Sequence, residues 1–207
     1  MIYSYKLEHD YGLAPNPFGQ YCTLAVCKPS IRNNKELVVG DWVIGTGSKS
    51  LGKLHHLIFA MKVEGKLTFQ EYWEDERFQY KKPVINGSLV QIYGDNFYHL
   101  DKEGNWIQEY SAHSVADAEQ HMENDLSGEY VLFSEHFYYF GHSAPIIPTE
   151  LRDVCNKGRN MKSKGIDSDI RRDFLTWLNE NFEKGIHGDP INWSEYSDVH
   201  SQTQLDI

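Results

Sequence analysis

Short apolar stretches, each closed by Gly, Pro, Asn or Asp, fill the chain from Ile2 to Pro148 and restrict this part to strands of a few residues. After Pro148 the pattern changes to a polar connection, one amphipathic helix and a polar tail. This order predicts an α+β fold, with a β-rich body over residues 1–148 and a C-terminal helical extension over 149–207 that packs on the same domain. We expect a mainly antiparallel curved sheet or a partly closed β-barrel with short helices.

Period-two alternation locates the strands. Leu57, Phe59 and Met61 fall on one face of a segment whose other face is more polar, as in a half-buried strand. A hairpin is expected from residues 98–100 and 106–108, because the turn-forming residues 101–105 (DKEGN) separate them. Further strands are expected at residues 2–7, 21–26, 42–46, 89–93, 130–134 and 137–140.

Three segments carry helix signals. Thr68 and Glu71 have the spacing of a capping box, which predicts a short helix through about residue 75. Ser114 with Asp117 indicates the start of another brief helix. A late helix is predicted by an apolar stripe at helical spacing, with Asp167 or Ser168 as its cap and Gly185 at its end; the stripe consists of Ile166, Ile170, Phe174, Trp177, Leu178 and Phe182.

Charge and cysteine content exclude several classes of protein. With 20 Lys and Arg against 30 Asp and Glu, the net charge is −10, which argues against a general electrostatic grip on duplex DNA and leaves only local contacts. No apolar run is long enough for a membrane span and no signal peptide is evident, so we expect a cytoplasmic protein. If one strand runs through Cys22 and Cys27, they point to its opposite faces and cannot readily share a metal. The sequence also has no HExxH or EF-hand spacing, and we predict no metal site and no cofactor.

The sequence contains an incomplete phosphate-binding P-loop motif. Gly47 to Lys53 reads GxxxxGK, but Leu54 replaces the Ser or Thr that holds magnesium, and a strand pattern follows where a helix is needed. We therefore reject a nucleoside triphosphatase. Backbone amides near Ser48 can still hold a single anion, although a plain flexible turn is the simpler alternative.

Polar and aromatic residues suitable for a nucleobase gather in the second half of the β-rich body. Amides and histidines can read a base edge, and an aromatic ring offers a stacking face. The alternative is a purely structural role, in which these residues form turns, contacts between strands and part of the hydrophobic core. The predicted ligand-binding set has Lys28 and Ser48 for phosphate, Tyr139 for stacking, and Asn16, Asn96, His99, Gln108 and His113 for polar contacts.

An enzymatic alternative stays open. His99 and His113 can exchange protons near neutral pH, with Asp95 orienting one of them. A third possibility is a protein-interaction module with an aromatic surface.

Several separated blocks of the sequence resemble the second family of nucleotide modification associated domains, over about residues 1–141. The blocks are residues 10–18 (DYGLAPNPF), 22–29 (CTLAVCKP), 40–48 (GDWVIGTGS), 67–73 (LTFQEYW), 94–99 (GDNFYH) and 137–141 (FYYFG). Such domains are encoded beside base-modifying enzymes in phages and bacteria. The resemblance implies binding of a nucleotide or a modified base, possibly in DNA, with other proteins of a nucleotide-modification or phage-related defence system as partners and no membrane. By analogy, the layout is also similar to the PUA and EVE barrels that hold a flipped base.

Overall fold

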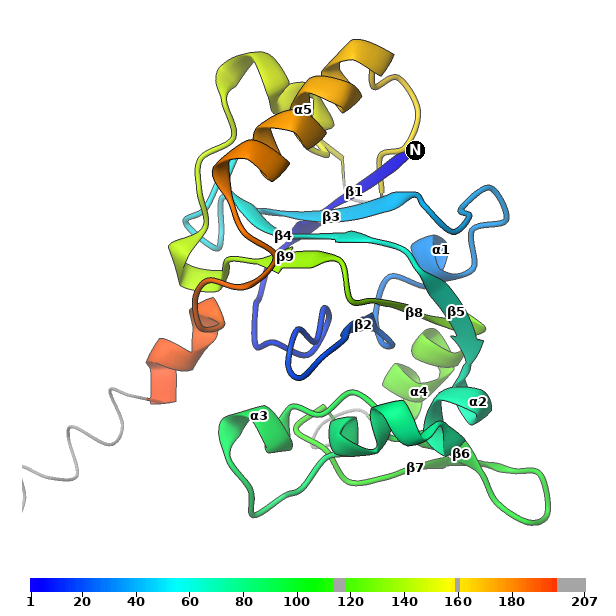
Figure 1. The fold of residues 1–207 in the computed structure, drawn as a ribbon. Coiled ribbons are helices and arrows are strands. Elements are labelled where there is room, and N and C mark those ends of the chain that lie inside the picture. Colours follow the sequence, from blue (N-terminus) through cyan, green and yellow to red (C-terminus); the bar gives the residue numbers. More distant parts are fainter. Residues whose placement is uncertain (114–117, 159–160, 197–207) are drawn as a thin grey trace, which may run out of the picture.

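The computed structural model describes residues 1–113, 118–158 and 161–196 of the 207-residue chain. Its strands form a five-stranded sheet in the order β1-β3-β4-β9-β10, a three-stranded sheet in the order β2-β8-β5, and the hairpin β6-β7 (Figure 1). The five-stranded sheet consists of β1 (Ile2–Leu7), β3 (Trp42–Gly47), β4 (Leu57–Lys62), β9 (Phe137–Tyr139) and β10 (Gly185–Ile186). The remaining strands are β2 (Cys22–Leu24), β5 (Gly65–Thr68), β6 (Tyr98–Leu100), β7 (Trp106–Gln108) and β8 (Tyr130–Ser134).

The five-stranded sheet is mixed. Strand β1 runs parallel to β3, and β10 runs parallel to β9, whereas β3-β4 and β4-β9 are antiparallel. The three-stranded sheet and the hairpin are antiparallel, as expected. Within the described residues no closed barrel forms, because β1 and β10 end the order of the five-stranded sheet without pairing with each other. The α+β class is therefore confirmed, and closure into a barrel is not.

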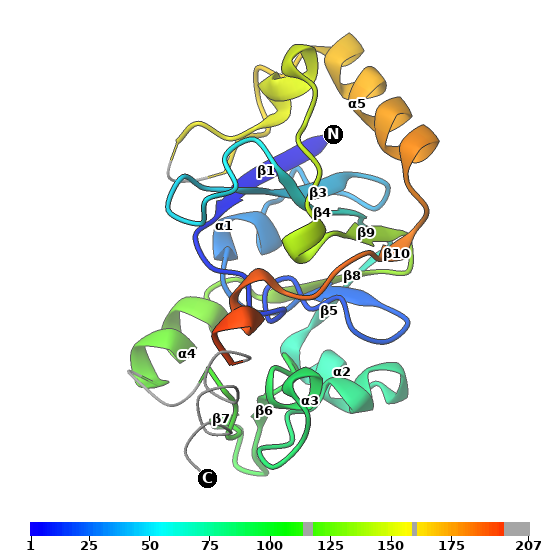
Figure 2. The same cartoon turned by 90° about the vertical axis from the view of Figure 1, so that its left-hand side faces the viewer.

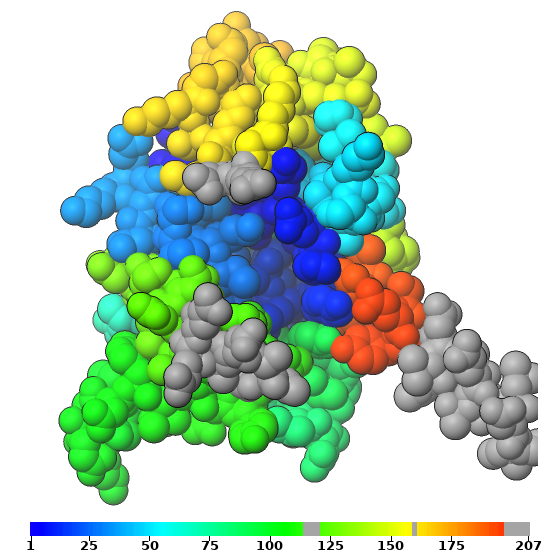
Figure 3. Space-filling view, turned by 180° about the vertical axis from the view of Figure 1, so that it is seen from behind, coloured from blue at the N-terminus to red at the C-terminus, as the bar shows by residue number. Residues whose placement is uncertain are grey.

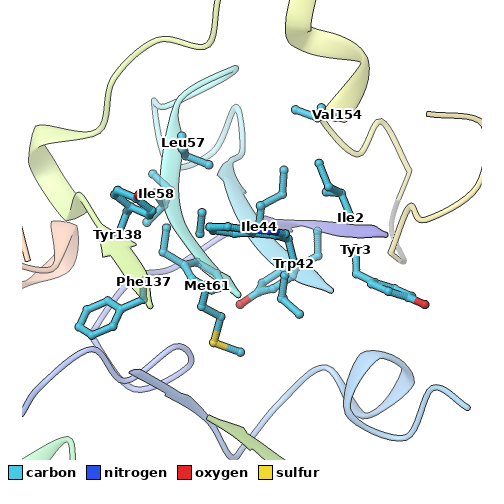
Figure 4. Packing of buried hydrophobic residues seen from close by; sticks show 14 of the residues in the cluster. Ile2, Tyr3, Trp42, Ile44, Leu57, Ile58, Met61, Phe137, Tyr138 and Val154 are labelled. Carbon is cyan, nitrogen blue, oxygen red and sulfur yellow. The ribbon is translucent and has the colours of Figure 1, made fainter. Parts of the chain in front are cut away.

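The molecule is built in layers, with the five-stranded sheet buried on both faces. Ile2, Ile44 and Tyr138 project to the side that carries Val154, whereas Tyr3 and Met61 project to the opposite side (Figure 4). The first side is covered by the 3₁₀ helix η3 (Thr149–Val154) and by α5 (Ser168–Asn181), and the second faces the three-stranded sheet (Figure 1). Burial on both faces explains the mostly apolar sequences of β3 and β4. The expectation that one face of β4 is polar is wrong, because Ile58 and Ala60 are as fully buried as Phe59.

Helix α5 confirms the predicted late helix. Its Asp167 side chain accepts a hydrogen bond from the Asp169 N–H, and Phe174 and Leu178 are fully buried in the core of the five-stranded sheet. The helix ends at Asn181, with Phe182 as its C-cap, rather than at Gly185, because Gly185 begins β10. The domain boundary at residue 148 stays a prediction, although η3 and α5 share the core of the preceding strands.

A second layer of short helices lies beyond the three-stranded sheet, together with the hairpin (Figures 1 and 2). The capping box at Thr68 is present and begins α2 (Phe69–Glu74). The predicted strand at residues 89–93 is wrong, because Ser88 and Gln91 form a second capping box that begins α3 (Leu89–Ile92). The expected helix start at Ser114 and Asp117 lies outside the described residues. The other helices used below are α1 (Pro29–Arg32), α4 (Ala118–Leu126), η1 (Glu76–Lys81) and η4 (Ile191–Trp193).

Candidate functional site

The turn between β2 and α1 has an unusual backbone. Cys27 and Lys28 both adopt left-handed conformations, with φ of 57° and 43°. A side chain makes this conformation costly, by about 1–3 kcal/mol for each residue, so it persists only where the surroundings impose it. Cys27 and Lys28 are adjacent non-glycine residues that both have a positive φ, and this marks the turn as a candidate functional element.

Arg32 and Asp125 impose this conformation. The Cys27 N–H donates to Asp125 Oδ1 at 2.6 Å, and the Cys27 carbonyl accepts from Arg32 Nε at 2.7 Å. The buried Arg32 guanidinium also donates to the carbonyls of Asp125 and Tyr130, at 2.5 and 2.8 Å. One side chain thus ties together the turn, the end of α4 and the start of β8.

Three chemically reactive side chains meet at this turn, and we call Cys27, His113 and Asp125 the Cys27 cluster. The thiol sulfur, an imidazole nitrogen and a carboxylate oxygen all lie within 4.8 Å of one another. Asp125 Oδ2 is 3.2 Å from His113 Nε2 and accepts from the Tyr98 hydroxyl at 3.1 Å. Burial raises the pKa of the Cys27 thiol to about 11, so the isolated thiol is protonated at neutral pH.

Two hollows meet at Cys27 and Lys28. One of about 430 Å³ is lined by both residues together with α1, Asn124 and Met161. The other, of about 220 Å³, is lined by both residues together with Tyr5, Glu8 and His9. Figure 3 shows this face of the molecule, where the N-terminal residues lie recessed among their neighbours. Lys28 Nζ is 5.0 Å from the centre of the Tyr5 ring, a cation–π contact that keeps the ammonium group beside the smaller hollow.

A stack of aromatic rings reaches the smaller hollow, and we call His9, Tyr11 and Tyr93 the His9 stack. The rings of His9 and Tyr11 have centres 6.2 Å apart and an interplanar angle of 18°; those of Tyr11 and Tyr93 are 5.5 Å apart at 14°. His9 is exposed and lines the hollow, whereas Tyr93 is buried. The stack therefore presents the flat His9 ring to solvent, while the buried Tyr93 ring supports the stack at its other end.

Asn16, Asp95 and Asn96 belong to a separate buried set around Lys81, which we call the Lys81 network. Lys81 Nζ donates to the carbonyl and the side-chain oxygen of Asn16, at 3.0 and 2.7 Å. The carbonyl of Lys81 accepts from the Asn96 N–H at 3.1 Å. All four side chains are at most 2% exposed, so this network has the form of a structural core.

Electrostatics within the Lys81 network follow from burial. Asp95 accepts from the Thr23 hydroxyl at 2.6 Å and from the Tyr72 hydroxyl at 2.7 Å. Burial lowers the pKa of Lys81 to about 8, while the nearby Asp95 carboxylate favours its charged form. Burial also raises the pKa of Asp95, and Lys81 opposes this shift.

The remaining predicted residues lie in other surroundings. The His99 ring stacks on Trp73 with centres 4.1 Å apart, and its Nε2 is 2.9 Å from Glu109 Oε1. The buried Ser48 hydroxyl accepts from the Leu51 N–H at 3.1 Å, as in a turn. Tyr139 is fully buried and donates to Asp10 at 2.6 Å. Gln108 is half-buried, and its Nε2 has no hydrogen-bond partner within the described part of the chain.

The structure therefore brings together only part of the predicted set. His113 belongs to the Cys27 cluster, Lys28 follows Cys27 in the chain and lines the same hollows as Cys27, and Asn16, Asp95 and Asn96 belong to the Lys81 network. The ligand roles of all these residues stay predictions. Cys27, Asp125 and His9 were missed, because their partners are distant in the sequence; the one available signal was Cys27 within the block CTLAVCKP.

Comparison with known proteins identifies one match. The family model described as nucleotide modification associated domain 2 matches residues 1–197, which extends beyond the blocks found by inspection and includes α5. A search of curated proteins found no match, and neither did a search of solved structures. Among the described residues, no helix is long and apolar enough to cross a membrane.

Proposed function

The chain belongs to the nucleotide modification associated domain 2 family, and from this premise we propose that it binds a nucleotide or a modified base, alone or extruded from DNA, in the hollows at Cys27 and Lys28. The observation that carries the proposal is the position of Lys28, which lines both hollows from a backbone that Asp125 and Arg32 fix. A cation held in this way is a preorganised phosphate contact, because little freedom remains to be lost on binding.

The His9 stack supports the heterocyclic part of the ligand. An exposed ring backed by two parallel rings offers a stacking surface, and stacking on an aromatic side chain contributes about 1–3 kcal/mol per base. His9 and Lys28 line the same smaller hollow, so one nucleotide can contact both. Local contacts of this kind suit a chain with a net charge of −10, which gains little from long-range attraction to DNA.

An enzyme acting on the bound nucleotide is a second candidate, favoured by the pairing of His113 with Asp125 at 3.2 Å. A carboxylate beside an imidazole orients the ring for proton transfer. This candidate is based on His113 with Asp125, because Asp95 accepts from Thr23 and Tyr72, and His99 contacts Trp73. The catalytic roles of His99, His113 and Asp95 stay predictions.

Binding is tested with the full chain and a panel of nucleoside 5′-monophosphates, modified nucleotides and a short single-stranded DNA, measured by isothermal titration calorimetry. Lys28→Ala should weaken binding about tenfold, equivalent to about 1.4 kcal/mol. His9→Ala should weaken it similarly for every base, because stacking does not depend on base identity. Lys102→Ala is the matched control, since Lys102 lies in the exposed β6-β7 turn.

Two outcomes would contradict the proposal. One is that no member of the panel binds to the wild type at millimolar concentrations. The other is that Lys28→Ala and Lys102→Ala bind equally well. Mass spectrometry of the same mixtures separates the two candidates, because an enzyme changes the mass of its substrate whereas a binding protein returns it unchanged.

A further inference from the structure

We propose that Cys27, His113 and Asp125 form a zinc-binding site. The donor set of one sulfur, one imidazole nitrogen and one carboxylate oxygen suits Zn²⁺, which accepts all three types. Three protein ligands would leave one position for water or a ligand atom, as in zinc sites that perform chemistry. The inference concerns the chain alone and does not require that a nucleotide binds.

The separations between donors fit a tetrahedral ion. Nitrogen and oxygen ligands about 2.0–2.1 Å from Zn²⁺ lie about 3.3 Å apart in that geometry, and His113 Nε2 is 3.2 Å from Asp125 Oδ2. All three donor atoms lie within 4.8 Å of one another, whereas sulfur and nitrogen ligands of a tetrahedral Zn²⁺ are about 3.6 Å apart, so binding would require the Cys27 sulfur to move closer.

The Asp125 carboxylate is also oriented by hydrogen-bond donors that are not metal ligands. Asp125 Oδ2 accepts from the Tyr98 hydroxyl and Oδ1 from the Cys27 N–H, and such outer bonds orient metal ligands. Asp125 is 1% exposed, so the carboxylate is fixed before any ion arrives. Metal binding would release the thiol proton of Cys27 to solvent, and the thiolate and carboxylate would together neutralise the charge of Zn²⁺.

Two of the three ligand residues are accessible from outside the protein. Cys27 lines both hollows, and the His113 side chain is 17% exposed, so an ion can approach these two residues without unfolding. Without an ion, the same distances describe a hydrogen bond between His113 and Asp125 beside a protonated thiol, and the experiment must separate these two states.

Binding of Co²⁺ in place of Zn²⁺ distinguishes a metal site from a hydrogen bond between His113 and Asp125 without a metal. The full chain is stripped with a chelator, titrated with Co²⁺ and followed by absorption spectroscopy. We expect one equivalent of Co²⁺ to produce the visible bands of a tetrahedral ion together with a near-ultraviolet thiolate-to-cobalt charge-transfer band, and Zn²⁺ to abolish both. Cys27→Ser should remove the charge-transfer band, and His113→Ala should remove tight binding. Tyr98→Phe keeps all three ligands and should weaken affinity about tenfold.

Control variants distinguish the loss of a metal ligand from misfolding of the protein. Cys155→Ser alters a buried thiol outside the cluster and His142→Ala alters an exposed imidazole, so both should keep the wild-type spectrum. Circular dichroism of each variant verifies folding. A wild type that binds no Co²⁺ would overturn the proposal, and so would a charge-transfer band that survives in Cys27→Ser. Nucleotide binding is measured separately on stripped protein, so failure of either proposal is recognised independently of the other.

Discussion

Asp125 Oδ1 accepts the backbone N–H of Cys27 at 2.6 Å, so the end of α4 fixes the turn that carries Cys27 and Lys28. The same carboxylate accepts the Tyr98 hydroxyl from the β6-β7 hairpin. One buried acid therefore joins a loop, a helix and a hairpin that are separate in the sequence. Its removal should affect both stability and the geometry of the two hollows.

Asp125→Ala should lower the free energy of unfolding by about 3 kcal/mol, because two buried donors lose their acceptor at about 1–3 kcal/mol each. Urea denaturation followed by circular dichroism measures this change. Glu123→Ala is the control, since Glu123 is exposed on the same helix and should change stability by less than about 0.5 kcal/mol. Equal midpoints for the two variants would show that Asp125 does not hold the turn.

Lys81 makes stability depend on pH in a definite direction. Its pKa is lowered to about 8 in the folded chain from an ordinary value of 10.5, because burial disfavours the ammonium form. Between pH 8 and 10.5 the unfolded chain binds more protons than the folded chain at this residue, so Lys81 makes the unfolding free energy increase with pH. Lys81→Met should remove this increase, seen as a shallower stability profile between pH 8 and 10 than in the wild type.

Lys102→Met provides the comparison for the pH profile, because Lys102 is exposed and should leave the wild-type slope unchanged. Urea midpoints collected at several pH values give the slopes. Parallel profiles for the wild type and Lys81→Met would mean that Lys81 keeps an ordinary pKa when folded.

Local signals predicted much of the fold. The strand at residues 2–7 and the hairpin are found as expected, since alternation and turn residues act over a few positions. The capping box at Thr68 is confirmed, whereas the equivalent pair of Ser88 and Gln91 lies where the sequence predicts a strand, because the apolar residues after Ser88 resemble one. Parallel pairing of β1 with β3 was not foreseen, because it depends on the path of the long connection between them.

The candidate site was less predictable than the fold. Lys28, predicted as a phosphate contact, lines an open hollow, and its phosphate role stays a prediction. Cys27 was set aside because Cys22 cannot share a metal with it, and the structure supplies other neighbours, His113 and Asp125, from distant segments. The Asn16 side chain has the polarity of a ligand contact, yet it accepts from Lys81, and the Asn96 side chain donates to the carbonyls of Tyr72 and Phe78. Polarity alone does not distinguish a pocket from a buried network.

Thr68→Ala should cost about 1 kcal/mol of stability, the usual effect of losing an N-cap side chain. The Thr68 hydroxyl accepts from the Glu71 N–H at 3.2 Å, and the Glu71 carboxylate accepts from the Thr68 N–H at 2.7 Å. Thr176→Ala serves as the control, because Thr176 is exposed inside α5, where alanine is the better helix former. If thermal denaturation gives both variants the same midpoint, the capping box contributes nothing measurable.

Gly128→Ala should disturb the Cys27 turn through Arg32. A Cβ at Gly128 would overlap the carbon of the guanidinium group and lie 2.6 Å from Nη2. Arg32 is fully buried and its guanidinium donates to three carbonyls, so it cannot move aside without breaking those hydrogen bonds. We expect a loss of about 1–3 kcal/mol in unfolding free energy, as for other overpacked sites.

The same variant should expose Cys27, because the Arg32 hydrogen bond to its carbonyl helps to keep the turn closed. Faster reaction of Cys27 with a thiol reagent, located by mass spectrometry, measures this opening. Gly158→Ala is the matched control, since a Cβ there comes no closer than 3.6 Å to Asn156 Oδ1. Wild-type stability together with wild-type reactivity in Gly128→Ala would show that Arg32 can relocate freely, and that the left-handed conformation of the turn does not depend on it.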